Sequence, residues 1–144
     1  MPISHVPSDS GDTLSLLGGV ATFKARHPSY SVIESSGQPG HGLPPHTHDD
    51  QDEGVYVLAG EYHLASGEDH LTLGPGSFAS IPRGTQHSLV VGGTEPARCL
   101  LIFDPPGAME RFLDEVRAAG DTPDERDVHA IARRLGLALL TSPV

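Results

Sequence analysis

The sequence predicts a mainly β domain that ends in two helices. Short apolar segments follow one another from Thr13 to Asp104, clusters of Gly, Pro, Ser and Asp separate them, and a helical spacing of apolar residues follows. Short strands with regular turns are typical of a sandwich or barrel, which leaves few strand edges exposed. The 144 residues suit one domain. We expect a flexible N-terminal segment at 1–12, the barrel at 13–104 and a helical extension packed on it at 105–144.

Ten segments of the barrel are predicted as strands, because each combines apolar residues with turn residues at its ends. They are 14–17, 19–25, 30–35, 45–47, 55–58, 61–65, 70–73, 77–81, 87–91 and 98–103. The Gly- and Pro-rich segment 38–45 is expected to be a compact connection, either a wall of a site or a plain loop.

Two C-terminal segments are predicted as helices. The first spans 108–119 and ends at Gly120. The second is expected to start with Thr122 as its cap, Pro123 in its first position and Glu125 reaching back. The apolar residues expected to pack on the barrel are Met109, Phe112, Leu113 and Val116 in the first helix and Val128, Ile131 and Leu135 in the second.

The charge of the chain argues against two classes of partner. Nine Lys and Arg residues stand against 19 Asp and Glu residues, a formal net charge of −10. Nucleic acids and anionic membrane surfaces require clustered basic side chains, so we expect neither. The polar N-terminal segment lacks the pattern of a signal peptide and no apolar run reaches membrane-spanning length, so a cytoplasmic protein is expected. The single cysteine, Cys99, lies in an apolar run and is predicted to be a buried core thiol.

Three histidines and one glutamate form the most informative pattern in the chain. His46 and His48 are two residues apart, Glu53 follows a polar turn, and His87 follows a second turn. Residues two apart in a strand point to the same face, so the first two imidazoles project the same way. A single strand cannot surround an ion, so Glu53 and His87 are expected to complete a metal site from other strands.

The donor set defines which ions fit. Three neutral imidazoles and one carboxylate suit one divalent transition metal ion, namely Fe, Ni, Mn, Cu, Co or Zn, and match calcium and magnesium poorly. Four protein ligands leave one or two positions for a substrate or O₂. By charge count an occupied site carries about +1, which favours an anionic or enolisable ligand.

These spacings resemble the two sequence motifs of the cupin family. Residues 40–60 fit Gly-x5-His-x-His-x4-Glu-x6-Gly at every fixed position. Residues 76–87 fit Gly-x5-Pro-x-Gly-x2-His, and Val91 stands where the family pattern ends in Asn. That Asn is not a metal ligand in the family, so the replacement concerns only the turn or the packing at this point.

The resemblance carries several implications. It implies a double-stranded β-helix (jelly-roll) barrel with the metal inside its mouth, a small-molecule substrate and a homodimer. Strands followed by two helices are similar to the order in bacterial quercetin dioxygenase-like cupins, which implies flavonol- or polyketide-like aromatic substrates. In quercetinase-like cupins the matching glutamate also takes a proton from the substrate hydroxyl, which implies a catalytic role for Glu53.

An apolar pocket is expected beside the ligands, because alternate residues of a strand share a face. Core packing is the alternative for each candidate. The candidates are Val55, Val57, Phe78, Ser80, Leu89 and Phe103.

Three functions remain open at this point, and a dioxygenase is the one we predict. In a dioxygenase a redox metal would hold an enolate or phenolate beside O₂. In a non-redox isomerase, cyclase, dehydratase or decarboxylase the ion would polarise a carbonyl, and His41, His63, His70 or Tyr56 would act as acid or base unless these are surface or sheet residues. A cupin that binds a metal or ligand without turnover is the third.

Overall fold

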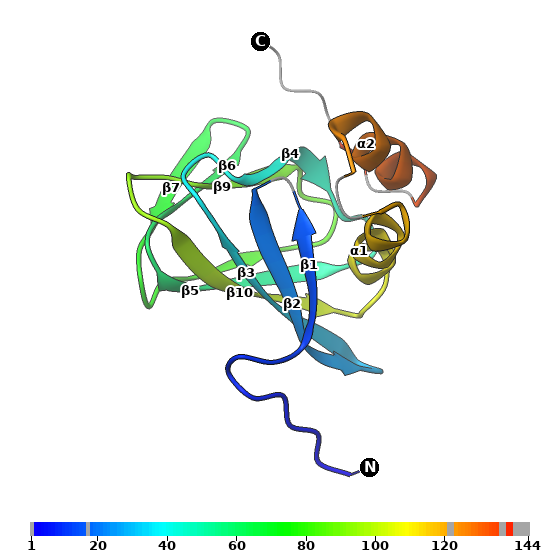
Figure 1. The fold of residues 1–144 in the computed structure, drawn as a ribbon. Helices are drawn as coiled ribbons and strands as arrows, with labels where there is room; N and C mark the ends of the chain where they lie inside the picture. The colour runs from blue at the N-terminus through cyan, green and yellow to red at the C-terminus, as the bar shows by residue number, and fades with distance from the viewer. Residues whose placement is uncertain (1, 17, 121–122, 136–137, 140–144) are drawn as a thin grey trace.

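Two antiparallel sheets face each other, and two helices lie side by side at one end of them (Figure 1). The computed structural model describes residues 2–16, 18–120, 123–135 and 138–139. The first sheet has the order β1 (Asp12–Leu16), β2 (Gly19–His27), β3 (Tyr30–Gly37), β10 (Ala97–Asp104), β5 (Asp52–Ala59) and β8 (Phe78–Ile81). The second has the order β11 (Ala138–Leu139), β4 (Gly42–Thr47), β9 (His87–Val91), β6 (Tyr62–Ser66) and β7 (Asp69–Leu73). The mainly β jelly-roll prediction is confirmed.

All ten predicted strands are present, and most start or end one to three residues away from the predicted bounds. Leu17, the last residue of the first predicted strand, lies outside the described residues. Strand β4 starts at Gly42, so half of the expected connection 38–45 is strand. Glycine permits this close pairing with β9, because a Cβ on Gly42 would lie 2.2 Å from the carbonyl oxygen of Leu89. Strand β11 was not predicted. Its two residues show no periodicity, and their pairing with His46 and Thr47 arises only in the tertiary structure.

The first predicted helix is confirmed, and the start of the second is corrected. Helix α1 spans Ala108–Ala118, and Gly120 follows its end with φ of 122°. Helix α2 spans Glu125–Arg134, so it begins after Pro123. Its cap is Asp124, whose Oδ1 accepts a hydrogen bond of 2.8 Å from the backbone of Asp127. Thr122, the predicted cap, lies outside the described residues. An aspartate caps a helix at least as well as a threonine, so Asp124, directly before the first helical residue, can act as the cap.

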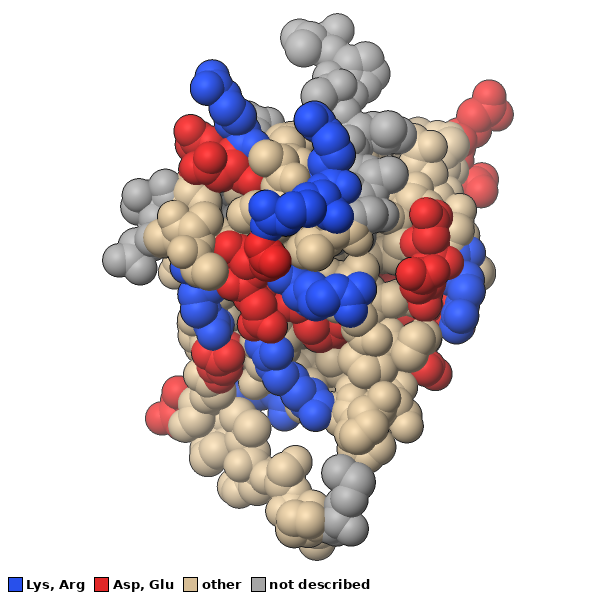
Figure 2. Space-filling view, turned by 90° about the vertical axis from the view of Figure 1, so that its right-hand side faces the viewer, with Lys and Arg blue, Asp and Glu red and all other residues tan. Residues whose placement is uncertain are grey.

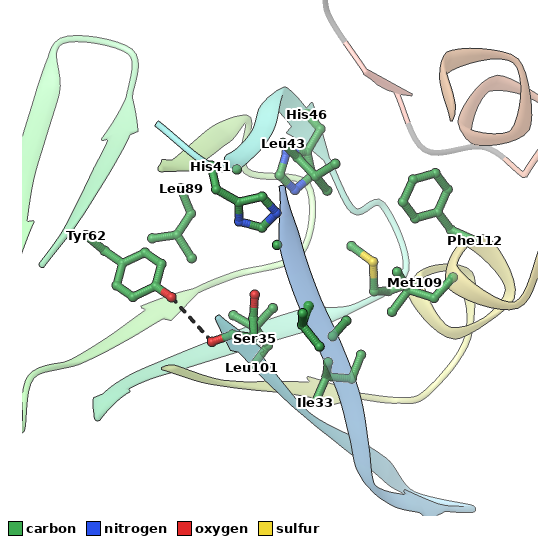
Figure 3. A pocket seen from close by; sticks show the side chains of 15 residues that line it. Ile33, Ser35, His41, Leu43, His46, Tyr62, Leu89, Leu101, Met109 and Phe112 are labelled. Carbon is green, nitrogen blue, oxygen red and sulfur yellow. Dashed lines mark hydrogen bonds between the residues drawn. The ribbon is translucent and has the colours of Figure 1, made fainter. Parts of the chain in front are cut away.

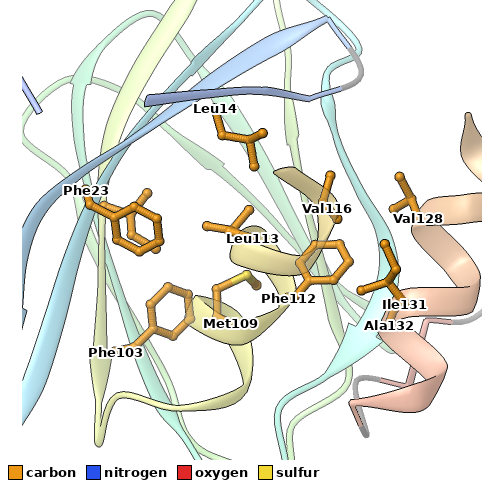
Figure 4. Packing of buried hydrophobic residues seen from close by; sticks show 11 residues of the cluster. Leu14, Phe23, Phe103, Met109, Phe112, Leu113, Val116, Val128, Ile131 and Ala132 are labelled. Carbon is orange, nitrogen blue, oxygen red and sulfur yellow. The ribbon is translucent and has the colours of Figure 1, made fainter. Parts of the chain in front are cut away.

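Two apolar clusters form the core. One joins the first sheet to both helices (Figure 4) and contains Leu14, Phe23, Ile33, Phe103, Met109, Phe112, Leu113, Val116, Val128, Ile131 and Ala132. The other fills the barrel between the sheets and contains Val55, Val57, Tyr62, Leu64, Leu73, Ile81, Val91, Ala97 and Cys99. Cys99 is fully buried, as predicted. The predicted stripes of both helices lie in the first cluster, with Leu135 partly buried against it.

Buried polar side chains fix the start of α1 against the barrel. The Gln51 amide donates to the carbonyl of Pro105 at 2.8 Å, and its oxygen accepts from the backbone of Met109 at 3.2 Å. The carboxylate of Glu110 accepts a hydrogen bond from the Ser31 hydroxyl. Gln51 belongs to the polar turn predicted before Glu53, yet it is 1% exposed. Its partners lie more than 50 residues away in the chain, so no local pattern reveals this burial.

Ion pairs hold the helical face together. Figure 2 shows Lys and Arg side chains interleaved with Asp and Glu on this face. Arg26 of β2 forms two hydrogen bonds with Asp114 of α1, at 2.8 and 3.1 Å. Arg117 of α1 lies 2.6 Å from Asp12 of β1. These partly exposed pairs orient α1 more than they stabilise it. In the described part of the chain, neither helix has the length and apolar character needed to span a membrane.

Candidate metal centre

The four predicted ligands converge inside the barrel. His46 lies in β4, His48 directly after it, and His87 in β9, all in or beside the second sheet. Glu53 reaches them from β5 of the first sheet. One donor atom from each residue lies within 4.8 Å of the others, and all four residues are buried. The cluster therefore bridges the two sheets, as the spacing of the motifs led us to expect.

Strand register and turn geometry explain this convergence. His46 and His87 are direct partners in the β4–β9 pair. Glu53 shares the inward face of β5 with Val55 and Val57. The turn before β9 is tied to the ligands, because the backbone of Gly84 donates to the carbonyl of His48 at 2.8 Å.

Backbone carbonyls orient two of the imidazoles. Nδ1 of His46 lies 2.9 Å from the carbonyl oxygen of Pro44, and Nδ1 of His87 lies 2.9 Å from that of Thr85. A carbonyl oxygen only accepts hydrogen bonds, so each Nδ1 carries a proton and each Nε2 is directed to the cluster. This is the second-sphere arrangement that holds histidine ligands of metal ions.

Burial and mutual contacts set the charges of the cluster. Burial lowers the pKa of His46 to about 4, and the nearby rings of His87 and His48 add to this shift. Burial also lowers the pKa of His48. Burial disfavours charge on His87 and Glu53 too, but a 2.9 Å hydrogen bond between Nε2 and Oε2 outweighs it. The pKa of His87 is therefore raised and that of Glu53 lowered. Without an ion, burial favours the neutral rings of His46 and His48, and the hydrogen bond favours the imidazolium–carboxylate form of His87 and Glu53.

The environment of His48 indicates whether a metal ion fits the cluster. Its side chain is 2% exposed, and neither of its nitrogens has a hydrogen-bond partner among the described residues. Its Nε2 lies 3.7 Å from Oε2 of Glu53. A buried polar group without a partner costs about 1–3 kcal/mol, and a divalent ion held by this nitrogen would remove that cost. The residues present fit such an ion.

The lowered pKa of His46 predicts acid sensitivity of the metal-free protein. Below pH 6.5, the ordinary pKa of histidine, the His46 side chain binds a proton in the unfolded chain. In the folded protein the same side chain binds it only near pH 4. His46 alone should therefore remove about 3 kcal/mol of stability between pH 6.5 and 4. His87, with its raised pKa, has the opposite sign: its contribution is complete below pH 6.5 and is lost above its folded pKa. Urea unfolding of the wild type and of His46→Leu at several pH values measures this slope. An equal slope in both proteins would contradict the prediction.

An apolar cavity lies next to His46 (Figure 3). Its volume is about 90 Å³. Leu43 and Leu89 line it from the second sheet, and Ile33 and Leu101 from the first. Helix α1 closes one end with Met109, Phe112 and Leu113. Four of the lining side chains are polar, namely Ser35, His41, His46 and Tyr62.

The six predicted pocket residues divide among three places. Leu89 lines the cavity. Val55, Val57 and Phe103 are fully buried core residues outside its lining, and the Phe103 ring lies 5.4 Å from that of His48. Phe78 and Ser80 do share one face of β8, but it is the outer one, because Ala79 and Ile81 point into the core. They border a groove on the outside of the first sheet instead.

Met109, Phe112 and Leu113 were not among the residues predicted to line a site. Their spacing predicted packing, and they do pack, but the same side chains also wall the cavity. A helical stripe carries no signal that separates these two roles.

The family of the chain follows from comparison with known proteins. The family model described as cupin domain matches residues 35–103, a range that contains all four residues of the cluster. This range is a cupin domain. The cupin is 37% identical over 59 residues to quercetin 2,3-dioxygenase of Bacillus subtilis (strain 168). That match spans 41% of the cupin and 18% of the relative.

Solved structures support the same fold. KdgF from a Halomonas species superimposes with a TM-score of 0.67 and 21% identity, over 73% of this cupin and 96% of that chain. The polyketide cyclase RemF from Streptomyces resistomycificus gives a TM-score of 0.63 and 21% identity, over 72% of this cupin and 80% of that chain. At such identities the likeness concerns the fold alone.

The structure also shows what replaces the family asparagine in this cupin. Val91 is 2% exposed and packs in the barrel core. Its backbone donates to the carbonyl of His41 and accepts from Gly40, both at 2.8 Å. The connection that leads into β4 is therefore held by main-chain bonds, which a valine makes as well as an asparagine.

Proposed function

We propose that this cupin is a metal-dependent dioxygenase that acts on a small enolic or phenolic substrate. One observation carries the proposal: a buried cluster of three histidines and one glutamate adjoins an apolar cavity through His46. The partial identity to a quercetin dioxygenase supports the choice of reaction.

His46, His48, Glu53 and His87 would hold the ion, which is Fe, Ni, Mn, Cu, Co or Zn by donor type. When bound, such an ion acidifies a substrate hydroxyl and, if it is redox-active, supports reaction with O₂. Glu53 would accept the proton of that hydroxyl, because its carboxylate lies buried within the cluster, beside the expected place of the substrate oxygen. Without the ion, Nε2 of His87 donates to this carboxylate, and a bound ion would take the place of that proton.

The cavity limits the size of the substrate. An engineered cavity of about 150 Å³ holds one benzene molecule, and this one measures about 90 Å³. A flavonol could place no more than part of one ring inside it. We therefore propose a substrate whose reacting part is a single ring or a short enol, with any further ring outside.

Incubation with and without O₂ tests the reaction class. The protein would be loaded separately with Fe²⁺, Ni²⁺, Mn²⁺ and Zn²⁺ and offered quercetin and one-ring phenols. A dioxygenase consumes one O₂ for each substrate molecule and yields products that together contain two more oxygen atoms than the substrate. Glu53→Gln should lower this rate about 100-fold or more. Turnover that consumes no O₂ would contradict the proposal.

A non-redox metal enzyme is the second candidate, because His41 lines the cavity and offers an acid–base group there. It predicts products formed under nitrogen, with atoms rearranged or water lost, and full activity with Zn²⁺. Saturable binding without any product would instead favour a non-catalytic cupin.

The homodimer stays a prediction, and the outer face of the first sheet offers an apolar surface for it. Tyr56 and Phe78 are 39% and 57% exposed and are direct partners in the β5–β8 pair. Half-buried Leu100 and Ile102 of β10 share this face. Light scattering after size exclusion should give twice the monomer mass, and Phe78→Lys should reduce it. A monomeric wild type would contradict the prediction.

A further inference from the structure

We propose that His41 is a substrate-binding residue, which holds a second oxygen of the substrate away from the metal ligands. The proposal rests on the proposed function, since the first oxygen is expected at the metal. Among the four residues considered as acid or base, His41 is the one that lines the cavity. Tyr56 lies on the outer face, and the side chain of His63 is 57% exposed beside Glu61. His70 is exposed in β7.

Two glycines make room for the His41 ring. Gly19 of β2 and Gly37 of β3 are direct partners in the sheet. A Cβ on Gly19 would lie 2.2 Å from Nε2 of His41, and one on Gly37 would lie 2.5 Å from its Nδ1. Any other residue at either position would occupy the volume of the imidazole. The ring therefore lies in a slot formed by two missing side chains.

The backbone gives no other reason for these glycines. Neither has a φ in the left-handed region, so any L-residue could adopt their conformations. Both are buried at strand ends, Gly19 at the start of β2 and Gly37 at the end of β3, and glycine loses more conformational freedom on folding than any other residue. What they provide is space for an imidazole at the cavity wall. The main-chain bonds between Val91 and residues 40 and 41 hold that imidazole in place.

Two other polar groups of the cavity have roles of their own. His46 is a candidate metal ligand. The Tyr62 hydroxyl donates to the carbonyl of Ser35 at 3.4 Å, and burial raises the pKa of Tyr62 far above its usual value, so Tyr62 stays neutral. Figure 3 shows the His41 ring directed into the cavity between these groups, among apolar side chains.

This arrangement defines a substrate class. The cavity has an apolar body that takes part of one ring, a metal-ligand cluster beside His46 and an imidazole at a separate point of its wall. A ring seated partly in this cavity would carry two oxygens on non-adjacent carbons, one directed to the metal and the other to His41. Phenols with one and two hydroxyl groups therefore serve as probes.

The test is a binding cycle under nitrogen with the Co²⁺-loaded full chain. The visible bands of Co²⁺ report binding of phenol, resorcinol, hydroquinone and catechol. Resorcinol or hydroquinone should bind about three- to tenfold more tightly than phenol, the gain expected from one hydrogen bond. His41→Phe should erase this gain and change the affinity for phenol less than about twofold. Catechol, whose oxygens are adjacent, should show no dependence on His41.

Two further variants separate hydrogen bonding from packing. His41→Gln keeps a donor and should retain part of the gain. Gly19→Ala keeps His41 but fills the space of its ring. Like His41→Phe, it should therefore bind resorcinol and hydroquinone no more tightly than phenol. Cobalt content and circular dichroism establish that each variant is folded and loaded. A full gain in His41→Phe or in Gly19→Ala would overturn the proposal.

Failure of this inference is distinguishable from failure of the proposed function. If phenols change the Co²⁺ spectrum but the isomers bind equally in all variants, only the role of His41 is wrong. If the protein binds no Co²⁺, or no phenol changes its spectrum, the metal site itself is refuted and the role of His41 with it.

Discussion

His48→Leu is expected to abolish tight metal binding while leaving the metal-free protein as stable as the wild type, or more stable by about 1 kcal/mol. The two nitrogens of His48 are buried without a hydrogen-bond partner in the described part of the structure. Leucine has a similar volume and no polar atom. The variant therefore avoids the desolvation cost of the imidazole and loses no hydrogen bond. Loss of one of four ligands should weaken metal affinity about 100-fold or more.

Thermal unfolding with and without Zn²⁺ measures both effects. Zinc at 100 times its dissociation constant should stabilise the wild type by about 2.7 kcal/mol and the variant hardly at all. His63→Leu is the matched control, since His63 is an exposed histidine outside the cluster and should leave zinc stabilisation intact. His46→Ala and His87→Ala should also release the ion and leave a folded barrel.

His87→Ala differs from His48→Leu in one respect. It leaves the Glu53 carboxylate buried without its partner, so it should destabilise the metal-free protein by about 3–5 kcal/mol. Equal metal content in the wild type and all ligand variants, measured by elemental analysis, would refute the assignment of the centre.

Phe112→Ala is expected to destabilise the protein by about 3–5 kcal/mol. The Phe112 side chain is fully buried, belongs to the cluster that joins α1 to the sheets, and lines the cavity. Removal of this ring reduces the apolar surface buried in the core. It also enlarges the cavity, and the closely packed neighbours relax only partly into the added volume. None of the four ligands lies in α1, so the variant should still bind one metal ion per chain if it is studied below its melting temperature.

Leu71→Ala is the control for this prediction. Leu71 is 54% exposed in β7 and lies outside the face proposed for the homodimer, so its removal should cost less than about 1 kcal/mol. Denaturant unfolding of the two variants gives the comparison. A similar loss in both would show that Phe112 does not support the core in the way its burial indicates.

Local pattern was sufficient for the strands and for the ligand cluster. Alternation and turn residues predicted ten strands, and the spacing of His46, His48, Glu53 and His87 predicted a cluster that the two sheets do bring together. Local pattern failed where the outcome depends on distant partners. Gln51 is buried because α1 offers it hydrogen bonds, and Phe78 points outward because Ile81 takes the inward face.

The amino-acid sequence by itself determined the ten strands along the chain, the donor set and the class of ion that such donors prefer. Only the tertiary structure decided where a ligand could enter and which further polar group it would meet. Side-chain chemistry and alternation are properties of a few neighbouring residues. The slot for His41 instead requires Gly19 and Gly37 to be paired across two strands, and the cavity requires α1 to close one end of the barrel. Such spaces exist only once distant segments have packed against one another.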